Sequence, residues 1–255
     1  MRKSLAVAAA ACGVVALSAL AVPSAYADEQ YGDTEITGVV VNGGDPVVVG
    51  TSARTVTVEV TATDPSGLDQ INATLYRGSF GAPDATVPSA AACGPTTDTT
   101  STCVLTFQLT PGTAPADTAQ AGTWQVSASA IAPDSDAAFR DSAATFALQR
   151  ETKLTVDATP DPVRWGKTLT VKGDVRHADW AAGTHASAGA GESARLQFRA
   201  AGCKEFRTVK TVTTAADGTL STTLRAYQDG TYRWSYAGTD STAAAVSDGE
   251  YVDVR

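Results

Sequence analysis

The sequence predicts an all-β protein of two tandem immunoglobulin-like β-sandwich domains that follow a cleaved signal peptide. One observation is an internal repeat, because Ala121–Ala128 and Asp229–Tyr236 each begin at a turn and continue with alternating residues. Another is that each half of the chain carries about seven short runs of period 2 with no helical stretch between them. The third is an apolar N-terminal segment after a positive start.

The N-terminal segment has the three parts of a secretory signal peptide. Arg2 and Lys3 precede an apolar run over Leu5–Val22, and Ala25–Ala27 forms a small-x-small cleavage signal. We expect residues 1–27 to be removed, which leaves a soluble, extracellular protein with no membrane anchor. A retained membrane anchor is the alternative, although the apolar run is marginal in length for spanning a bilayer.

The first domain is expected over residues 28–150. Turn clusters such as Asn42–Pro46 and Asp64–Gly67 separate its alternating runs. The predicted strands are Glu35–Val41, Val47–Val49, Arg54–Thr63, Gln70–Arg77, Cys103–Thr110, Thr123–Ile131 and Ser142–Gln149.

The second domain, over residues 151–255, repeats the scheme after almost no linker. We therefore expect the two domains to dock, or to hinge over a narrow range. We also expect the loop Arg176–Glu192 to lie at the junction as a mobile flap, with Trp180 packed there. The predicted strands are Lys153–Ala158, Lys167–Val175, Ala194–Arg199, Phe206–Thr214, Leu220–Ala226, Thr231–Ala237 and Gly249–Val254.

The two domains differ in charge. Residues 28–150 hold 14 acidic side chains and four arginines, whereas residues 151–255 hold 13 acidic and 13 basic side chains. The negative charge of the first domain argues against a nucleic-acid partner. It indicates either that the domain binds a cation or that the charge only keeps the protein soluble.

Five aspartates of the first domain form the candidate metal site, since the topology of such a sandwich brings their two loops to one end. Calcium accepts six to eight oxygen ligands in flexible geometry, so two facing acidic loops are a plausible calcium site. The alternative is turn chemistry, in which Asp side chains bond their own backbone, and no EF-hand order is present. The five candidates are Asp64, Asp69, Asp134, Asp136 and Asp141.

Three cysteines remain after the expected processing. Cys93 and Cys103 flank a short polar loop, so we expect a local disulfide in an oxidising compartment. Cys203 is expected at a hairpin tip without a partner, where it is either an exposed thiol or a tolerated turn residue.

The remaining candidates for chemistry favour a non-enzymatic protein. His177 and His185 lie in the flexible loop of the second domain, and they carry only a remote hydrolase hypothesis. Trp124 and Trp234 occupy equivalent strand positions and are expected in the cores rather than as a sugar-stacking platform. Four basic residues crowd one hairpin, either as a solvated face or as a contact for an anionic wall polymer: Arg199, Lys204, Arg207 and Lys210.

At the repeated strands, at Leu196–Arg199 and at Gly230–Arg233, the chain resembles secreted tandem immunoglobulin-like proteins of streptomycete-type actinobacteria, some of which carry a calcium-binding label. The resemblance covers most of residues 31–255 and rests on turn and core residues that specify a fold. It implies an extracellular binding or structural module. An unidentified extracellular protein or a cell-wall polysaccharide remains the alternative partner to calcium.

Overall fold

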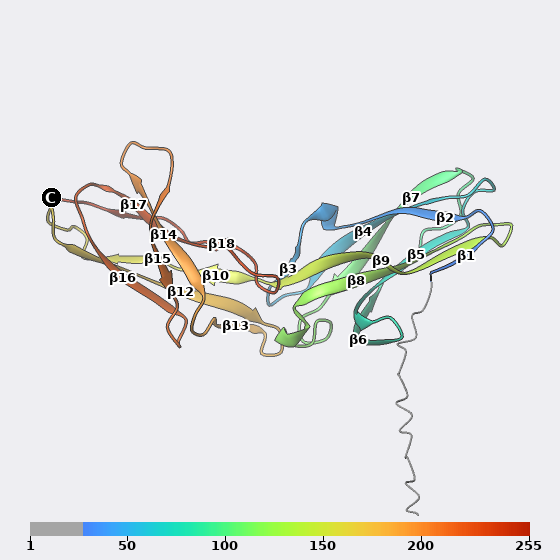
Figure 1. Cartoon of the computed structure of the whole chain (residues 1–255), viewed down its shortest axis with the longest axis horizontal. Helices are drawn as coiled ribbons and strands as arrows, with labels where there is room; N and C mark the ends of the chain where they lie inside the picture. The colour runs from blue at the N-terminus through green and yellow to red at the C-terminus, as the bar shows by residue number, and fades with distance from the viewer. Residues whose placement is uncertain (1–27) are drawn as a thin grey trace, which may run out of the picture.

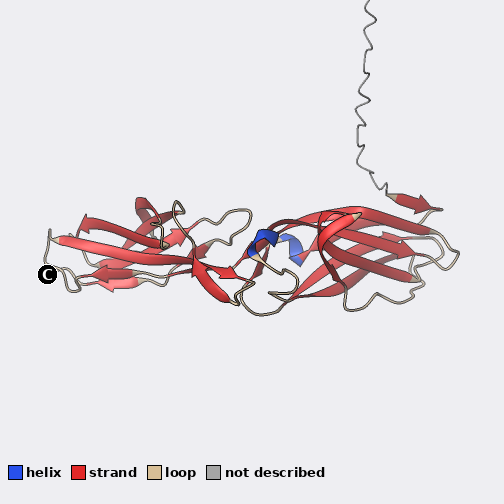
Figure 2. Cartoon of the chain, turned by 90° about the horizontal axis from the view of Figure 1, so that it is seen from below, coloured by secondary structure: helices blue, strands red, loops and turns tan. Residues whose placement is uncertain are grey.

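The computed structural model describes residues 28–255, so the expected signal peptide lies outside the described residues. The chain is 61% strand and 3% helix, which confirms the predicted all-β fold. The sheets form two packed pairs that lie end to end along the long axis of the molecule (Figures 1 and 2). Within residues 28–255 no helix has the length and apolar character needed to cross a membrane.

The first pair of sheets, called here the first sandwich, contains a six-stranded sheet of order β1-β9-β8-β5-β6, with β3 parallel to β9, and a three-stranded sheet of order β2-β4-β7. Two 3-10 turns, η1 (Asn42–Gly44) and η2 (Thr118–Gln120), join its strands. The strands are β1 (Glu29–Tyr31), β2 (Glu35–Val41), β3 (Val47–Val49), β4 (Arg54–Thr63), β5 (Gln70–Ser79), β6 (Ala82–Pro88), β7 (Thr100–Leu109), β8 (Gly122–Ile131) and β9 (Ala137–Arg150).

The second sandwich has one sheet built around β12, which pairs with β10, β11, β13 and β16, and another of order β15-β14-β17-β18 in which β19 also pairs with β17. Its strands are β10 (Thr152–Leu154), β11 (Asp157–Thr159), β12 (Thr168–Asp179), β13 (Thr184–Ser187), β14 (Ser193–Ala200), β15 (Arg207–Thr213), β16 (Thr219–Arg225), β17 (Gly230–Tyr236), β18 (Ala245–Val246) and β19 (Glu250–Val252).

Each sandwich closes on its own apolar cluster, because alternate residues of the strands face inward. The repeated tryptophans lie at the centres of these clusters with no exposed surface, which confirms their expected place in the cores. Each buried indole nitrogen donates to a carbonyl oxygen, from Trp124 to Gln120 at 2.7 Å and from Trp234 to Lys172 at 2.9 Å. The polar end of each ring is therefore satisfied inside the protein.

The two sandwiches meet without a linker, since β9 ends at Arg150 and β10 begins at Thr152. Trp180, the residue after β12, is 1% exposed and belongs to the apolar cluster of the first sandwich. Its indole nitrogen donates to the Val49 carbonyl at 3.1 Å, and the Glu151 backbone nitrogen donates to the same carbonyl at 2.9 Å. A side chain of the second sandwich thus completes the core of the first.

One expectation for this junction is corrected. Residues 176–192 were expected to form a mobile flap, but much of the segment is a β-hairpin in which β13 pairs with β12 from Arg176–Ser187 to Asp179–Thr184. Backbone pairing and the buried Trp180 hold the hairpin in place. The Ala and Gly residues that suggested mobility lie largely in the turns before and after β13.

Candidate functional site

Four aspartates meet at the end of the first sandwich that is remote from the junction. Asp33 follows β1, Asp64 follows β4, and Asp134 and Asp136 lie in the turn between β8 and β9. One carboxylate oxygen from each lies within 4.8 Å of the others. Of the five aspartates predicted from the sequence, the structure brings three together and adds Asp33.

Asp64 is the buried base of the cluster, at 1% exposure. Its Oδ1 accepts hydrogen bonds from the Ser66 backbone nitrogen at 2.7 Å and from the Ser66 hydroxyl at 2.6 Å, and its Oδ2 accepts one from the Thr34 hydroxyl. Burial raises the pKa of Asp64, but these hydrogen bonds to Ser66 and Thr34 outweigh it and hold the pKa below its ordinary value. The group is therefore ionised as well as structurally fixed.

Asp33 and Asp136 approach each other across two loops. The Asp136 Oδ2 accepts a hydrogen bond from the Asp33 backbone nitrogen at 3.0 Å. Gly32 makes this approach feasible, because a Cβ at that position would lie 1.7 Å from the Asp136 Oδ2 and because its φ of +68° favours glycine. The Asp134 Oδ1 in turn accepts a hydrogen bond from the Asp136 backbone nitrogen at 3.2 Å, and this bond orders the turn.

The electrostatics of the cluster favour a cation. Desolvation raises the pKa of Asp33, and the negative charges of Asp64 and Asp136 raise it further. A bound divalent ion would relieve the repulsion between these adjacent carboxylates. Calcium is the ion expected, because it accepts several oxygen ligands from separate segments of the chain. Asp64 and Asp134 each accept a hydrogen bond from the backbone nitrogen two residues later, as aspartates of ordinary turns do, so turn chemistry accounts for part of the arrangement.

Asp69 and Asp141 lie outside the four-aspartate cluster. Asp69 is exposed, and its backbone nitrogen bonds to the Ile131 carbonyl at 2.8 Å. Asp141 lies along β9, where burial and then the charges of Asp28 and Glu29 raise its pKa. The difference has a simple geometric reason, since β9 starts at residue 137 and carries residue 141 away from the turn along the strand.

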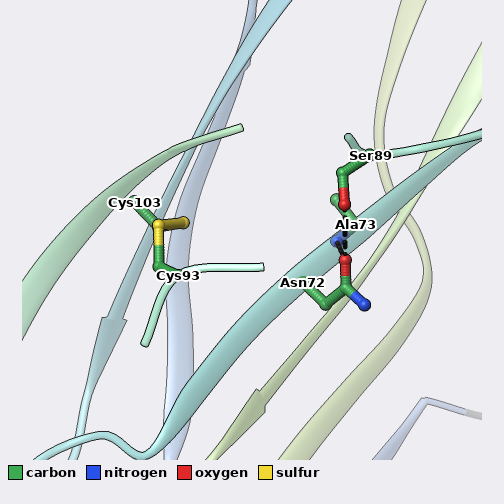
Figure 3. The surroundings of a disulfide bond; sticks show 5 residues. All are labelled: Asn72, Ala73, Ser89, Cys93 and Cys103. Atoms are coloured by element: carbon green, nitrogen blue, oxygen red, sulfur yellow. Dashed lines mark hydrogen bonds between the residues drawn. A yellow bond between two sulfur atoms is a disulfide. The ribbon is translucent and has the colours of Figure 1, made fainter. Parts of the chain in front are cut away.

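The predicted disulfide between Cys93 and Cys103 is confirmed, with Cα atoms 5.9 Å apart (Figure 3). Cys103 is a buried residue of β7, and Cys93 makes an isolated bridge to Ile71 of β5. The bond therefore ties the loop after β6 to both sheets. Cys203 is free and exposed, as the sequence predicted.

The two histidines lie at the junction rather than in a pocket. His177 is 2% exposed, with its Nδ1 3.0 Å from the Thr152 hydroxyl and its Nε2 3.9 Å from a Glu192 carboxylate oxygen. The His185 Nε2 lies 2.8 Å from a carboxylate oxygen of Glu151. Both rings thus hold polar contacts around the β9–β10 connection.

Comparisons with known proteins give little beyond the fold. A family described as being of unknown function, DUF5707, matches residues 46–130, which is a minority of the chain. No curated protein matches the sequence.

Three solved structures illustrate the similarity. Dimeric latent PorU from Porphyromonas gingivalis is 14% identical with a TM-score of 0.30, over 92% of this chain and 21% of that one. Red sea bream transglutaminase is 13% identical with a TM-score of 0.29, over 86% and 31%. The D00-D0 domain of intimin is 12% identical with a TM-score of 0.28, over 84% and 99%. This chain spans less than a third of the length of the first two, and similarity at this level supports no functional inference.

Proposed function

We propose that this protein is a secreted, non-enzymatic module that binds calcium through Asp33, Asp64, Asp134 and Asp136. The observation that carries the proposal is the convergence of four carboxylates from three segments, with oxygen atoms within 4.8 Å of one another. Bound calcium would link the turn after β1 to the β8–β9 turn and so stabilise the end of the first sandwich. An affinity in the weak extracellular range, on the order of 10⁻⁴ to 10⁻³ M, is expected.

The test is the thermal midpoint of the mature chain with calcium and with sodium chloride at matched ionic strength. At ten times Kd, calcium adds about 1.4 kcal/mol to the free energy of unfolding, which raises the midpoint by a few degrees. Sodium chloride screens the repulsion without coordinating, so it reproduces only part of the shift. Absence of a calcium-specific shift at millimolar concentration would refute the proposal.

Matched substitutions locate the site. Asp33→Asn with Asp134→Asn removes two exposed carboxylates of the cluster and is expected to abolish the calcium-specific shift, while Asp64 keeps its structural hydrogen bonds. Asp45→Asn with Glu59→Gln removes the same charge from exposed positions of the first sandwich and should leave the shift intact. Equal losses in both variants would mean that calcium acts only through general charge.

A second candidate function, recognition of a polysaccharide, is favoured by a hollow of about 380 Å³ on the six-stranded sheet. Two partly exposed aromatic rings, Phe80 and Phe139, line it together with Asn72 and the hydroxyls of Thr74 and Ser127. Aromatic faces and fixed polar groups are the surfaces that sugar rings pack against. Figure 3 shows the Asn72 Oδ1 held by the Ser89 hydroxyl, at 2.8 Å, which fixes the direction of the amide.

Retention on insoluble wall polysaccharide tests this candidate. Phe139→Ala is expected to weaken retention by roughly tenfold, since stacking and burial of one ring contribute about 1 to 2 kcal/mol. Trp165→Ala removes an aromatic ring that is 65% exposed on the second sandwich and serves as the control. If Trp165→Ala rather than Phe139→Ala reduces retention, the hollow is not the sugar site.

A further inference from the structure

The outer face of the β14–β17 pair carries a row of arginines. In β14, Ala194 and Leu196 face the core, so Arg195, Gln197 and Arg199 face outward. In β17, Tyr232 and Trp234 are buried, and Arg233 therefore points to the same outer face, directly opposite Gln197.

The register places Arg233 between Arg195 and Arg199 along the strand direction. Two residues of strand separate successive positions, a rise of roughly 6.6 Å. The three guanidinium groups thus form a zigzag row across two adjacent strands. We call Arg195, Arg199, Arg233 and the neighbouring Phe206 the arginine face.

Phe206, which precedes β15, holds two of these arginines in place. The guanidinium carbon of Arg233 lies 3.7 Å from the centre of its ring and that of Arg199 lies 4.7 Å from it. The Nε of Arg233 also donates to the Gln197 side chain at 2.8 Å. Contact with an aromatic face and one fixed hydrogen bond restrict the side chains while leaving the terminal Nη groups free to donate.

Within residues 28–255, no arginine of the arginine face makes an ion pair with a carboxylate. Among the described residues, the arginines in ion pairs are Arg77, Arg140 and Arg255, and none of these belongs to it. The outward positions of β14 and β17 carry no acidic side chain either. Unpaired positive charge on an acidic protein, with a sequence net charge of −8, is therefore a local feature of this surface.

The structure also separates this face from the basic hairpin predicted from the sequence. Arg207 is paired with Phe198 and Lys210 with Leu196, which are positions on the inner side of β14. Opposed residues of an antiparallel pair share a face, so Arg207 and Lys210 lie on the other side of the sheet from Arg199. Three of the four basic residues thus divide between two surfaces, and Lys204 lies in the connection between β14 and β15.

We propose that the arginine face binds a linear polymer bearing phosphate groups. Guanidinium forks match phosphate oxygens in pairs of parallel hydrogen bonds, and a row of three at regular spacing suits a repeating anion better than a single small ion. A second copy of the chain is the less favoured occupant, because the acidic cluster of the first sandwich is compact and Asp64 within it is buried and hydrogen-bonded. The inference is independent of the calcium and polysaccharide proposals, which concern the first sandwich.

The experiment measures binding of the mature chain to immobilised long-chain inorganic polyphosphate in the presence of a calcium chelator. Arg199→Gln with Arg233→Gln is expected to weaken binding by at least roughly tenfold, because two charge-assisted contacts are lost. Arg207→Gln with Lys210→Gln removes the same net charge from the same hairpin and should change affinity by less than about threefold. Affinity should also fall as sodium chloride rises from 50 to 200 mM in the unsubstituted chain.

Two further variants separate recognition from charge and from folding. Arg199→Lys with Arg233→Lys keeps the charge but removes the forks, and should still weaken binding by several-fold. Phe206→Leu keeps every charge and removes the ring that positions the guanidinium groups, so it should weaken binding without altering the fold, as judged by circular dichroism.

Three results would overturn the proposal: no binding of polyphosphate by the unsubstituted chain, equal loss in the two glutamine variants, or unchanged affinity in the lysine variant. Sedimentation velocity without polyphosphate supplies a fourth. Self-association at low salt that disappears in Arg199→Gln with Arg233→Gln would assign the face to a second copy of this chain instead.

Discussion

At the residue scale, His177 is a buried ring that lies among both charged and uncharged polar side chains at the junction. The groups that face it are Thr152, Glu192, Arg150, His185 and Tyr236, whose ring centre lies 5.7 Å from that of His177. Burial lowers the pKa of His177, and the Arg150 charge lowers it further, against the opposing effect of Glu192. Among the described residues the Nε2 has no hydrogen-bond partner, and burial favours the neutral form of the ring.

This pKa shift predicts the direction of a pH effect. Because the folded pKa lies below the unfolded value of about 6.5, the unfolded state binds the proton more readily, and stability falls as pH drops below 6.5 toward the folded value. His177→Phe removes the titration, so its thermal midpoint should fall less between pH 7 and pH 5 than that of the unsubstituted chain. The midpoints at pH 8, where the histidine is neutral in both states, give the cost of the substitution itself. Parallel pH curves for the two proteins would contradict this explanation.

At the element scale, the positions of the long alternating strands were predictable, whereas strands such as β6 and β18 and the partners of the strands were not. Alternation of apolar and polar residues marked β4 at Arg54–Thr63 within its observed bounds, since that strand has one core face and one solvent face. The short strand β1 at Glu29–Tyr31 was missed because it is exposed throughout and has no alternating pattern. Its hydrogen bonds to β9 are what place it, and such pairing leaves no local signal in the sequence.

The missed strand explains the missed site residue. Asp33 follows β1, and the pairing of Tyr31 with Ala137 brings this turn beside the β8–β9 turn that holds Asp136. Two of the cluster's segments were recognisable from loop composition and sandwich topology. The third depended on a long-range strand pairing. Gly32 was the remaining signal, because a glycine before an aspartate in an exposed segment permits the close approach that the structure contains.

At the scale of the whole molecule, the junction makes the two sandwiches dependent on each other. β9 passes into β10 with one residue between them, and backbone bonds join Arg150 to Ser241 at 3.0 Å and Ala178 to Glu151 at 2.8 Å. Trp180, which follows β12 of the second sandwich, adds a buried side chain to the hydrophobic cluster of the first. Contacts of this kind restrict the hinge that a two-domain chain would otherwise have.

Trp180 therefore should determine whether the molecule unfolds in one step. Trp180→Ala removes a side chain from the first cluster together with the hydrogen bond to Val49, and a loss of about 3 to 5 kcal/mol is expected. Because Trp180 directly follows β12 of the second sandwich but packs in the core of the first, its removal should also split a single calorimetric transition into two. Trp165→Ala removes a tryptophan that is 65% exposed and packs edge-to-face on Tyr227, so it should cost no more than about 1.5 kcal/mol and leave the transition single. If the unsubstituted chain already unfolds in two separate steps, or if Trp180→Ala leaves one transition, the buried tryptophan does not couple the two sandwiches.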